Sequence, residues 1–200
     1  MKNLKFKIKN FERGFTLTEL LISLMVLISV GVVAVTILTS SLRGANKTSA
    51  VNNIRQNGSY AMIQMSRAIQ YAKKFDGVKV NSSDSYTTNC VQSIPPAPTP
   101  TPTPAQYKFV KVTSFDGGQT VFSCDPTVLP NTIASNGASL LDTDSVSLGS
   151  SCLFTCTQGT TIDSPIINIS FSLSSSQQNL AENKVTVPFN TSVTVRNPQR

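Results

Sequence analysis

Two sets of residues in this chain could take part in specific chemistry: one carboxylate, Glu19, which could form an ion pair, and four cysteines, which could form disulfides. Glu19 immediately precedes residues 20–42, a run of 23 residues dominated by Leu, Ile, Val and Met with no formally charged side chain. Burying an unpaired carboxylate in apolar surroundings is expensive, so a charge at this position needs a partner of opposite sign. The chemistry to expect of Glu19 is therefore an ion pair, not catalysis.

The composition argues against an enzyme. The 200 residues contain no histidine and no tryptophan. Without histidine, the commonest proton shuttle and the Ser-His and Cys-His nucleophile pairs are ruled out. Carboxylates are sparse, and no segment matches a Gly-rich phosphate loop or a zinc-binding spacing. We therefore expect no catalytic residue, no cofactor and no metal ion.

The basic excess is concentrated at the N-terminus. Lys and Arg total 17 against 10 Asp and Glu, a net charge of +7. The first fourteen residues hold five basic side chains and one acidic one, which leaves 12 basic and 9 acidic groups for all the others. No basic patch is interleaved with aromatic residues, so we predict no specific nucleic-acid partner.

The apolar run has the length of a membrane span. As a helix, residues 20–42 would extend roughly 34 Å at about 1.5 Å per residue, enough for a hydrocarbon core of about 30 Å. A long buried helix of a soluble protein is the alternative. More basic residues precede the run than closely follow it, which favours a cytoplasmic N-terminus and a C-terminal part outside. The run is too long for an ordinary secretory signal and lacks its cleavage site.

The residues before the run form a specific motif. A short basic leader is followed by Gly14, Phe15 and, five residues after the glycine, Glu19, and then directly by the apolar run. This motif closely resembles the signal of type IV prepilins. The resemblance implies that a membrane-embedded prepilin peptidase cuts between Gly14 and Phe15 on the cytoplasmic side and methylates the new amine of Phe15. It also implies an inner-membrane assembly platform and other pilin subunits as partners.

The resemblance suggests a partner for Glu19. After cleavage, the Phe15 amine is a positive charge at the end of an apolar helix. The Glu19 carboxylate of another copy could neutralise it when N-terminal helices pack side by side with an axial offset, which would also set the register between subunits. A competing explanation is that an acidic residue in the first turn of a helix is favoured by the helix dipole.

An amphipathic helix is expected to continue from residue 43 to residue 80. Apolar residues recur there at spacings of three and four, which gives one face for a core; they are Val51, Ile54, Gly58, Ala61, Met65, Ala68 and Ala72, widened by Met62 and Ile69. Packing on the chain's own sheet is favoured over a coiled-coil face for a partner. Gly31 and Gly58 are expected to be weak points, because glycine costs about 1 kcal/mol inside a helix.

The remaining sequence predicts a loop and then β structure. Residues 81–106 are rich in Ser, Thr and Pro, with six prolines in residues 95–104; they predict an extended polyproline II loop at the surface, with an SH3-type ligand as the alternative. In residues 107–200, a hairpin around Asp116-Gly117-Gly118 and two alternating segments predict an antiparallel sheet of four or more strands. The fold class is α+β, a long helix packed on an antiparallel sheet, as the pilin resemblance also implies.

Periodicity constrains the cysteines Cys90, Cys124, Cys152 and Cys156, which would all lie outside the cytoplasm, where disulfides persist. Val146, Leu148, Cys152, Phe154 and Cys156 share one face if residues 146–156 form a strand. Two residues four apart on a strand are separated by about 13 Å, beyond the roughly 7 Å limit for a disulfide. Cys152 and Cys156 would then pair with Cys90 and Cys124. A turn at residues 153–155 would restore a local 152–156 bridge, and free thiols or a metal site are the further alternatives.

These inferences divide the chain into five parts. They are a cleaved leader (1–14), a transmembrane and assembly helix (15–42), its amphipathic continuation (43–80), a loop (81–106) and a β domain (107–200). The function they predict is a structural subunit of a type IV pilus, minor or priming, that leaves the inner membrane for the filament. The alternatives are a minor pseudopilin of a type II secretion system and a membrane-tethered β domain that binds a partner without polymerising.

Overall fold

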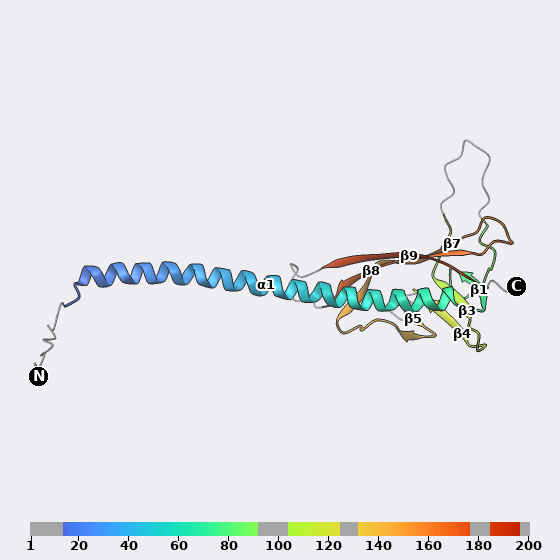
Figure 1. Cartoon of the computed structure of the whole chain (residues 1–200), viewed down its shortest axis with the longest axis horizontal. Helices are drawn as coiled ribbons and strands as arrows, with labels where there is room; N and C mark the ends of the chain where they lie inside the picture. The colour runs from blue at the N-terminus through green and yellow to red at the C-terminus, as the bar shows by residue number, and fades with distance from the viewer. Residues whose placement is uncertain (1–13, 92–103, 125–131, 177–184, 197–200) are drawn as a thin grey trace, which may run out of the picture. The chain divides into compact units, whose positions relative to one another are not determined.

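The computed structural model describes residues 14–91, 104–124, 132–176 and 185–196. Residues 1–13 of the expected leader and most of the proline run lie outside the described residues. The chain divides into two compact units, Met1–Ala45 and Asn46–Arg200. Figure 1 shows the elements and their labels.

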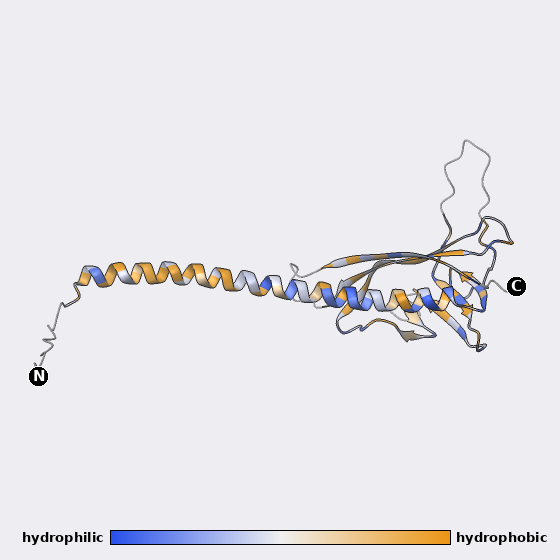
Figure 2. Cartoon of the chain, in the orientation of Figure 1, coloured by the Kyte–Doolittle hydropathy of each residue, from blue (hydrophilic) through white to orange (hydrophobic). Residues whose placement is uncertain are grey.

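In the first unit, the described residues form the beginning of helix α1 (Leu17–Gln70). Every residue from 14 to 45 is exposed, including the large apolar ones, and apolar colour surrounds this part of the helix in Figure 2. Among the described residues, α1 is the one helix long and apolar enough to cross a membrane. A helix that is hydrophobic all round is typical of a membrane span.

In the second unit, α1 is amphipathic and packs on β structure. Its buried residues are Ile54, Gly58, Ala61, Met65 and Ile69. They repeat at spacings of three and four, and Ala72 extends the row just beyond the helix. The predicted apolar stripe is therefore confirmed as a core face, with Val51, Met62 and Ala68 at its half-buried margins.

The helix does not reach residue 80, so the expected extent of the amphipathic continuation is wrong. It ends at Gln70, and strand β1 (Lys74–Lys79) follows. Long-range backbone bonds set this end: the Arg196 N–H donates to the Gln70 carbonyl at 3.3 Å, and the Lys73 N–H donates to the Thr113 carbonyl at 2.8 Å. Gly77, with φ of +119°, has a backbone conformation that a helix cannot contain.

Two antiparallel sheets form, where a single sheet was expected. The five-stranded sheet has the order β1-β3-β4-β5-β6, and the four-stranded sheet has the order β2-β7-β8-β9. The strands are β2 (Gln106–Tyr107), β3 (Phe109–Thr113), β4 (Gln119–Ser123), β5 (Ala134–Ser135), β6 (Ala138–Ser139), β7 (Val146–Thr157), β8 (Ile166–Ser175) and β9 (Thr186–Thr194). The β structure thus begins at residue 74, before the loop, and not at residue 107.

Both predicted strand pairs are present. Strands β3 and β4 form a hairpin whose register pairs Thr113 with Gln119. Its turn contains Gly117 at φ of +85°, and the Asp116 carboxylate accepts a bond from the Gly118 N–H at 2.9 Å. Strands β8 and β9 pair along their length, and Pro188 lies on β9, at the edge of its sheet, where a missing N–H is tolerated.

The core lies between the helix stripe and the inner faces of both sheets. Its largest fully buried members include Met65 from α1, Val110 from β3, and Phe171 and Phe154 from the four-stranded sheet. Burial alternates along β8, as expected for a strand with one covered face. The coarse prediction of a long helix packed on antiparallel β structure, an α+β fold, is therefore confirmed.

Gly58 has a packing role that the sequence did not reveal. A Cβ atom on Gly58 would lie 2.1 Å from Cζ of Phe189 on β9, so only glycine lets this ring approach the helix backbone. The Phe189 ring in turn stacks on Phe171, with 5.2 Å between ring centroids. The glycine that appears as a weak point of the helix thus allows close packing of α1 against β9 of the four-stranded sheet.

Candidate functional site

The first candidate site is the N-terminal end of α1. Gly14 and Phe15 precede the helix; a Cβ added to Gly14 would meet no atom within 4 Å, and the Phe15 side chain is 77% exposed. The peptide bond at which cleavage is expected is thus accessible in this structure. Its surroundings are formed by residues 14–19, because the leader itself is outside the described residues.

Thr16 caps the helix. The Glu19 N–H donates to the Thr16 carbonyl at 3.1 Å and lies 3.3 Å from Thr16 Oγ1. The spacing Thr-x-x-Glu is that of a capping box, in which a side-chain oxygen of the first residue accepts from the backbone of the fourth. Sequence analysis missed this signal, although the four residues can be read directly from the chain. Thr16 is therefore a further residue of the site, and Glu19 has a local role in the first turn.

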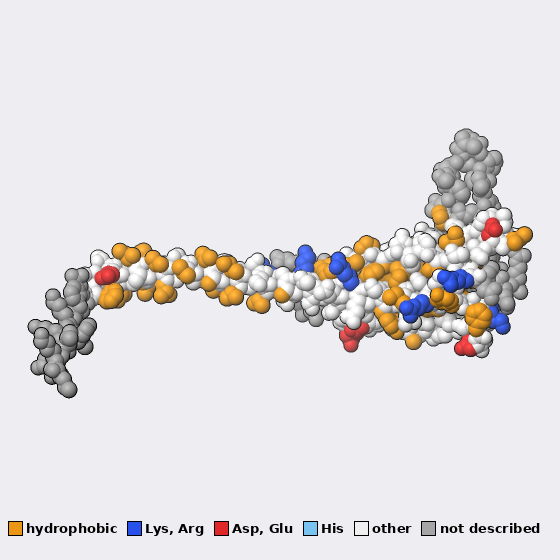
Figure 3. Space-filling model, viewed as in Figure 1, with side chains coloured by type: hydrophobic (Ala, Val, Ile, Leu, Met, Phe, Trp, Pro, Cys, Tyr) orange, Lys and Arg blue, Asp and Glu red, His pale blue; other side chains and the backbone are white. Residues whose placement is uncertain are grey.

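The capping role leaves the Glu19 charge itself unmatched. Glu19 is exposed, and its carboxylate has no ion pair or hydrogen bond within the part of the chain that the structure describes. The next 23 residues carry no charge. Figure 3 shows hydrophobic side chains distributed over the visible surface of this helix segment. A single carboxylate therefore lies at the end of an apolar helix segment. It is accessible to a cation from outside the described residues.

The second candidate set, the cysteines, is joined across the fold. Cys90 bonds to Cys156 and Cys124 bonds to Cys152, with Cα–Cα distances of 5.4 and 5.6 Å. Cys152 and Cys156 both lie on β7 and both face the core side, so each takes a partner from another segment. This is the cross-linked arrangement that the strand interpretation of residues 146–156 favours, and it leaves no local bridge between these two cysteines.

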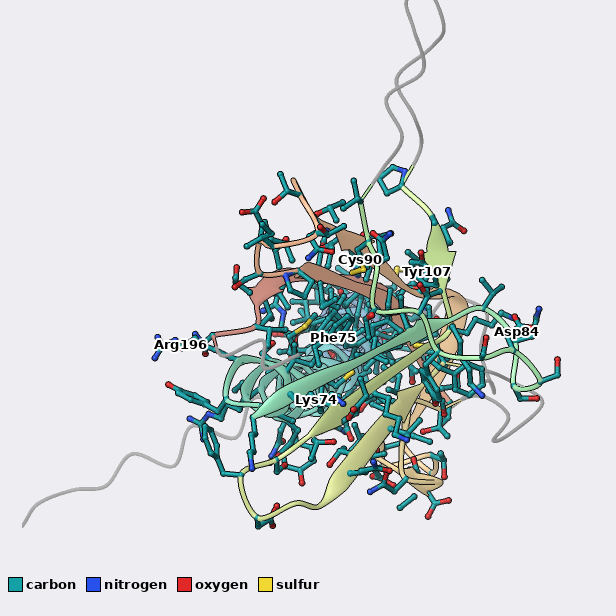
Figure 4. All side chains as sticks on the ribbon, turned by 90° about the vertical axis from the view of Figure 1, so that its right-hand side faces the viewer. Lys74, Phe75, Asp84, Cys90, Tyr107 and Arg196 are labelled. Carbon is teal, nitrogen blue, oxygen red and sulfur yellow. A yellow bond between two sulfur atoms is a disulfide. The ribbon has the colours of Figure 1, made fainter. Side chains whose placement is uncertain are left out.

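The Cys90–Cys156 disulfide links the residues just before the proline-rich segment to strand β7. Beside the Cys90–Cys156 bond, the Cys90 N–H donates to Gln158 Oε1 at 3.2 Å, and Val91 forms a parallel bridge with Gln158. On the far side of the segment, Gln106 and Tyr107 pair with Thr155 and Phe154 of β7. Figure 4 shows Cys90 and Tyr107 on the same side of the domain. Both ends of the loop are thus held by the end of one strand.

Comparisons of the chain with protein-family models, with curated proteins and with solved structures give no match.

Proposed function

We propose that the chain is a structural subunit of a type IV pilus, minor or priming, that is cleaved between Gly14 and Phe15, methylated on Phe15 and assembled through the first half of α1. The observation that carries this proposal is Glu19, an exposed carboxylate without a partner among the described residues at the start of a 23-residue uncharged segment. In a bilayer such a charge is costly alone and tolerable when paired. The Phe15 amine of a neighbouring copy is the partner that assembly would supply.

The two units suit the two stages of this proposal. The first half of α1 is exposed and apolar on all sides, which suits a membrane before assembly and lateral packing against other helices afterwards. The second unit has its own core and two disulfides, which persist in an oxidising compartment outside the cytoplasm. The partners proposed are the prepilin peptidase, the inner-membrane assembly platform and other pilin subunits.

Processing is tested by the mass of the mature chain. We expect a chain that begins at N-methylated Phe15, and we expect Gly14→Val to retain residues 1–14, because a branched side chain blocks the peptidase. A mature chain that begins at Met1 would instead favour the membrane-tethered β domain. Processing does not separate a pilus from a type II secretion pseudopilus, because both use the same signal.

Assembly is tested by Glu19→Gln, which keeps the shape of the side chain and removes its charge. The variant should be cleaved and should accumulate in the membrane with its second unit folded. It should be poorly incorporated into sheared filaments, because breaking one partner of a buried ion pair typically costs about 3–5 kcal/mol. Incorporation at wild-type stoichiometry would refute the ion-pair proposal.

Thr16→Ala is the matched control for the capping role. It removes the hydroxyl that accepts from the Glu19 N–H but keeps the carboxylate. Losing an N-cap costs about 1 kcal/mol, so incorporation should fall much less than in Glu19→Gln. Equal losses in the two variants would assign the effect to helix capping.

A further inference from the structure

A polar hollow lies in the second unit, between α1 and the turn that leads into β7. Its volume is about 430 Å³, within the range of about 300–1,000 Å³ typical of small-molecule sites. Among the described residues, its lining consists of Asn53, Gln56, Asn57 and Tyr60 from α1, and Asp142 and Ser145 from the turn. Neither lysine nor arginine is among them.

One wall of the hollow is fixed by hydrogen bonds. The Asn57 amide donates to the Asn53 carbonyl at 3.0 Å, and its Oδ1 accepts from the Asp142 N–H at 3.0 Å, across 85 residues of sequence. The Asp142 carboxylate accepts from the Ser145 hydroxyl and from the Asp144 N–H. These bonds hold the turn against the helix, so the hollow is formed before any ligand arrives.

The α1 side of the hollow also offers unused polar groups. The Asn53 and Gln56 amides and the Tyr60 hydroxyl make no hydrogen bond within the described ranges of the chain. Each amide presents two donors and one acceptor oxygen, and the phenol is both donor and acceptor. The Tyr60 side chain is 54% exposed, so part of its surface faces solvent beside these groups.

We infer that this hollow is a binding site for a neutral saccharide. Sugar hydroxyls both donate and accept, as the free amides of Asn53 and Gln56 do, and the C–H face of a sugar ring can pack on the Tyr60 ring. Among the described lining residues an anionic ligand would find no cation, and the Asp142 carboxylate already accepts two bonds. The inference goes beyond the proposed assembly function and does not depend on it.

The test is saturation-transfer NMR on the full-length protein in a sugar-free zwitterionic detergent. Maltotriose and triacetylchitotriose are the neutral probes, sialyllactose is the anionic probe, and the glucosamine trimer is the cationic probe. We expect the neutral probes to receive saturation and the charged ones to receive less. Gln56→Ala and Tyr60→Ala should each weaken binding by up to about tenfold, the scale of one lost aromatic or hydrogen-bonding contact.

Ile63→Ala is the control, since Ile63 is exposed one turn further along α1 and does not line the hollow. It should leave binding unchanged. The inference would be overturned if no neutral probe received saturation, or if sialyllactose received as much as the neutral probes. It would also be overturned if Ile63→Ala weakened binding as much as Gln56→Ala or Tyr60→Ala. If the hollow instead binds a second copy of the chain, Tyr60→Ala should dissociate oligomers in sedimentation experiments, and no saccharide should bind. That result would also overturn the saccharide inference.

Discussion

The two halves of helix α1 differ in the distribution of their apolar side chains, although they belong to one element. Residues 17–45 are exposed on every side and carry apolar residues all round, whereas residues 46–70 bury a single stripe and expose polar residues elsewhere. A helix with one apolar face needs one packing surface, and a helix apolar all round needs an apolar environment on all sides. The first half is therefore a candidate membrane span by length and composition, and the second half packs on its own sheets.

Removing a large side chain from each region should produce the largest difference between them. Phe171 on β8 is 1% exposed and stacks on Phe189, so Phe171→Ala should destabilise the second unit by about 3–5 kcal/mol. Leu27, in the first half of α1, is 73% exposed. Leu27→Ala should therefore leave the free energy of unfolding of the second unit unchanged. Urea unfolding in detergent, followed by circular dichroism of the β structure, measures both.

Equal losses in the two variants would contradict the division of α1 into halves with separate environments. A loss confined to Phe171→Ala would support it.

A smaller contrast comes from two of the glycines of α1, Gly58 and Gly31. Gly58→Ala would place its Cβ 2.1 Å from the Phe189 ring, whereas a Cβ on Gly31 would meet no atom within 4 Å. Overpacking costs about 1–3 kcal/mol and exceeds the helix-propensity gain of up to about 1 kcal/mol. Gly58→Ala should therefore lower the stability of the second unit by about 1–2 kcal/mol, and Gly31→Ala should not.

The Gly58 account can be checked with a double-mutant cycle. In a Phe189→Ala background the clash is absent, so Gly58→Ala should become neutral or stabilising. If Gly58→Ala destabilises the two backgrounds equally, the close approach of the Phe189 ring does not explain the glycine.

The elements that the sequence predicted are those specified by local patterns. The stripe from Ile54 to Ile69, the hairpin around Gly117 and the paired strands β8 and β9 each follow from periodicity or turn chemistry within a short segment. The N-terminal motif is also local, and so is the Thr-x-x-Glu spacing that specifies the Thr16 cap.

The features that the sequence did not predict depend on contacts between distant segments. The helix ends at Gln70 because Arg196 and Thr113 bond the backbone near its end, and neither residue is close in sequence. The division into two sheets follows from pairings that include two-residue strands too short to give a periodic signal. The polar hollow exists because Asn57 bonds to Asp142, 85 residues away.

The smallest expected effect concerns titration: residues 20–42 contain no ionisable group, whereas the second unit contains Tyr86. Burial raises the pKa of Tyr86 above its usual value of 10.0. Its ring is contacted by Lys79, whose Nζ lies 4.8 Å from the ring centroid, and by Lys111 at 5.5 Å.

A raised pKa in the folded state means that the folded chain holds the phenol proton more tightly than the unfolded chain does. The stabilisation is fully present below the unfolded-state pKa of about 10 and is lost as pH rises through the folded-state pKa. The free energy of unfolding of the second unit should therefore fall above about pH 10. Urea titrations between pH 8 and pH 11 should show a shallower fall in Tyr86→Phe, because the lysines and the other tyrosines are common to both proteins. An identical fall in the two proteins would mean that the alkaline loss of stability arises from those shared groups and that burial of Tyr86 contributes nothing to it.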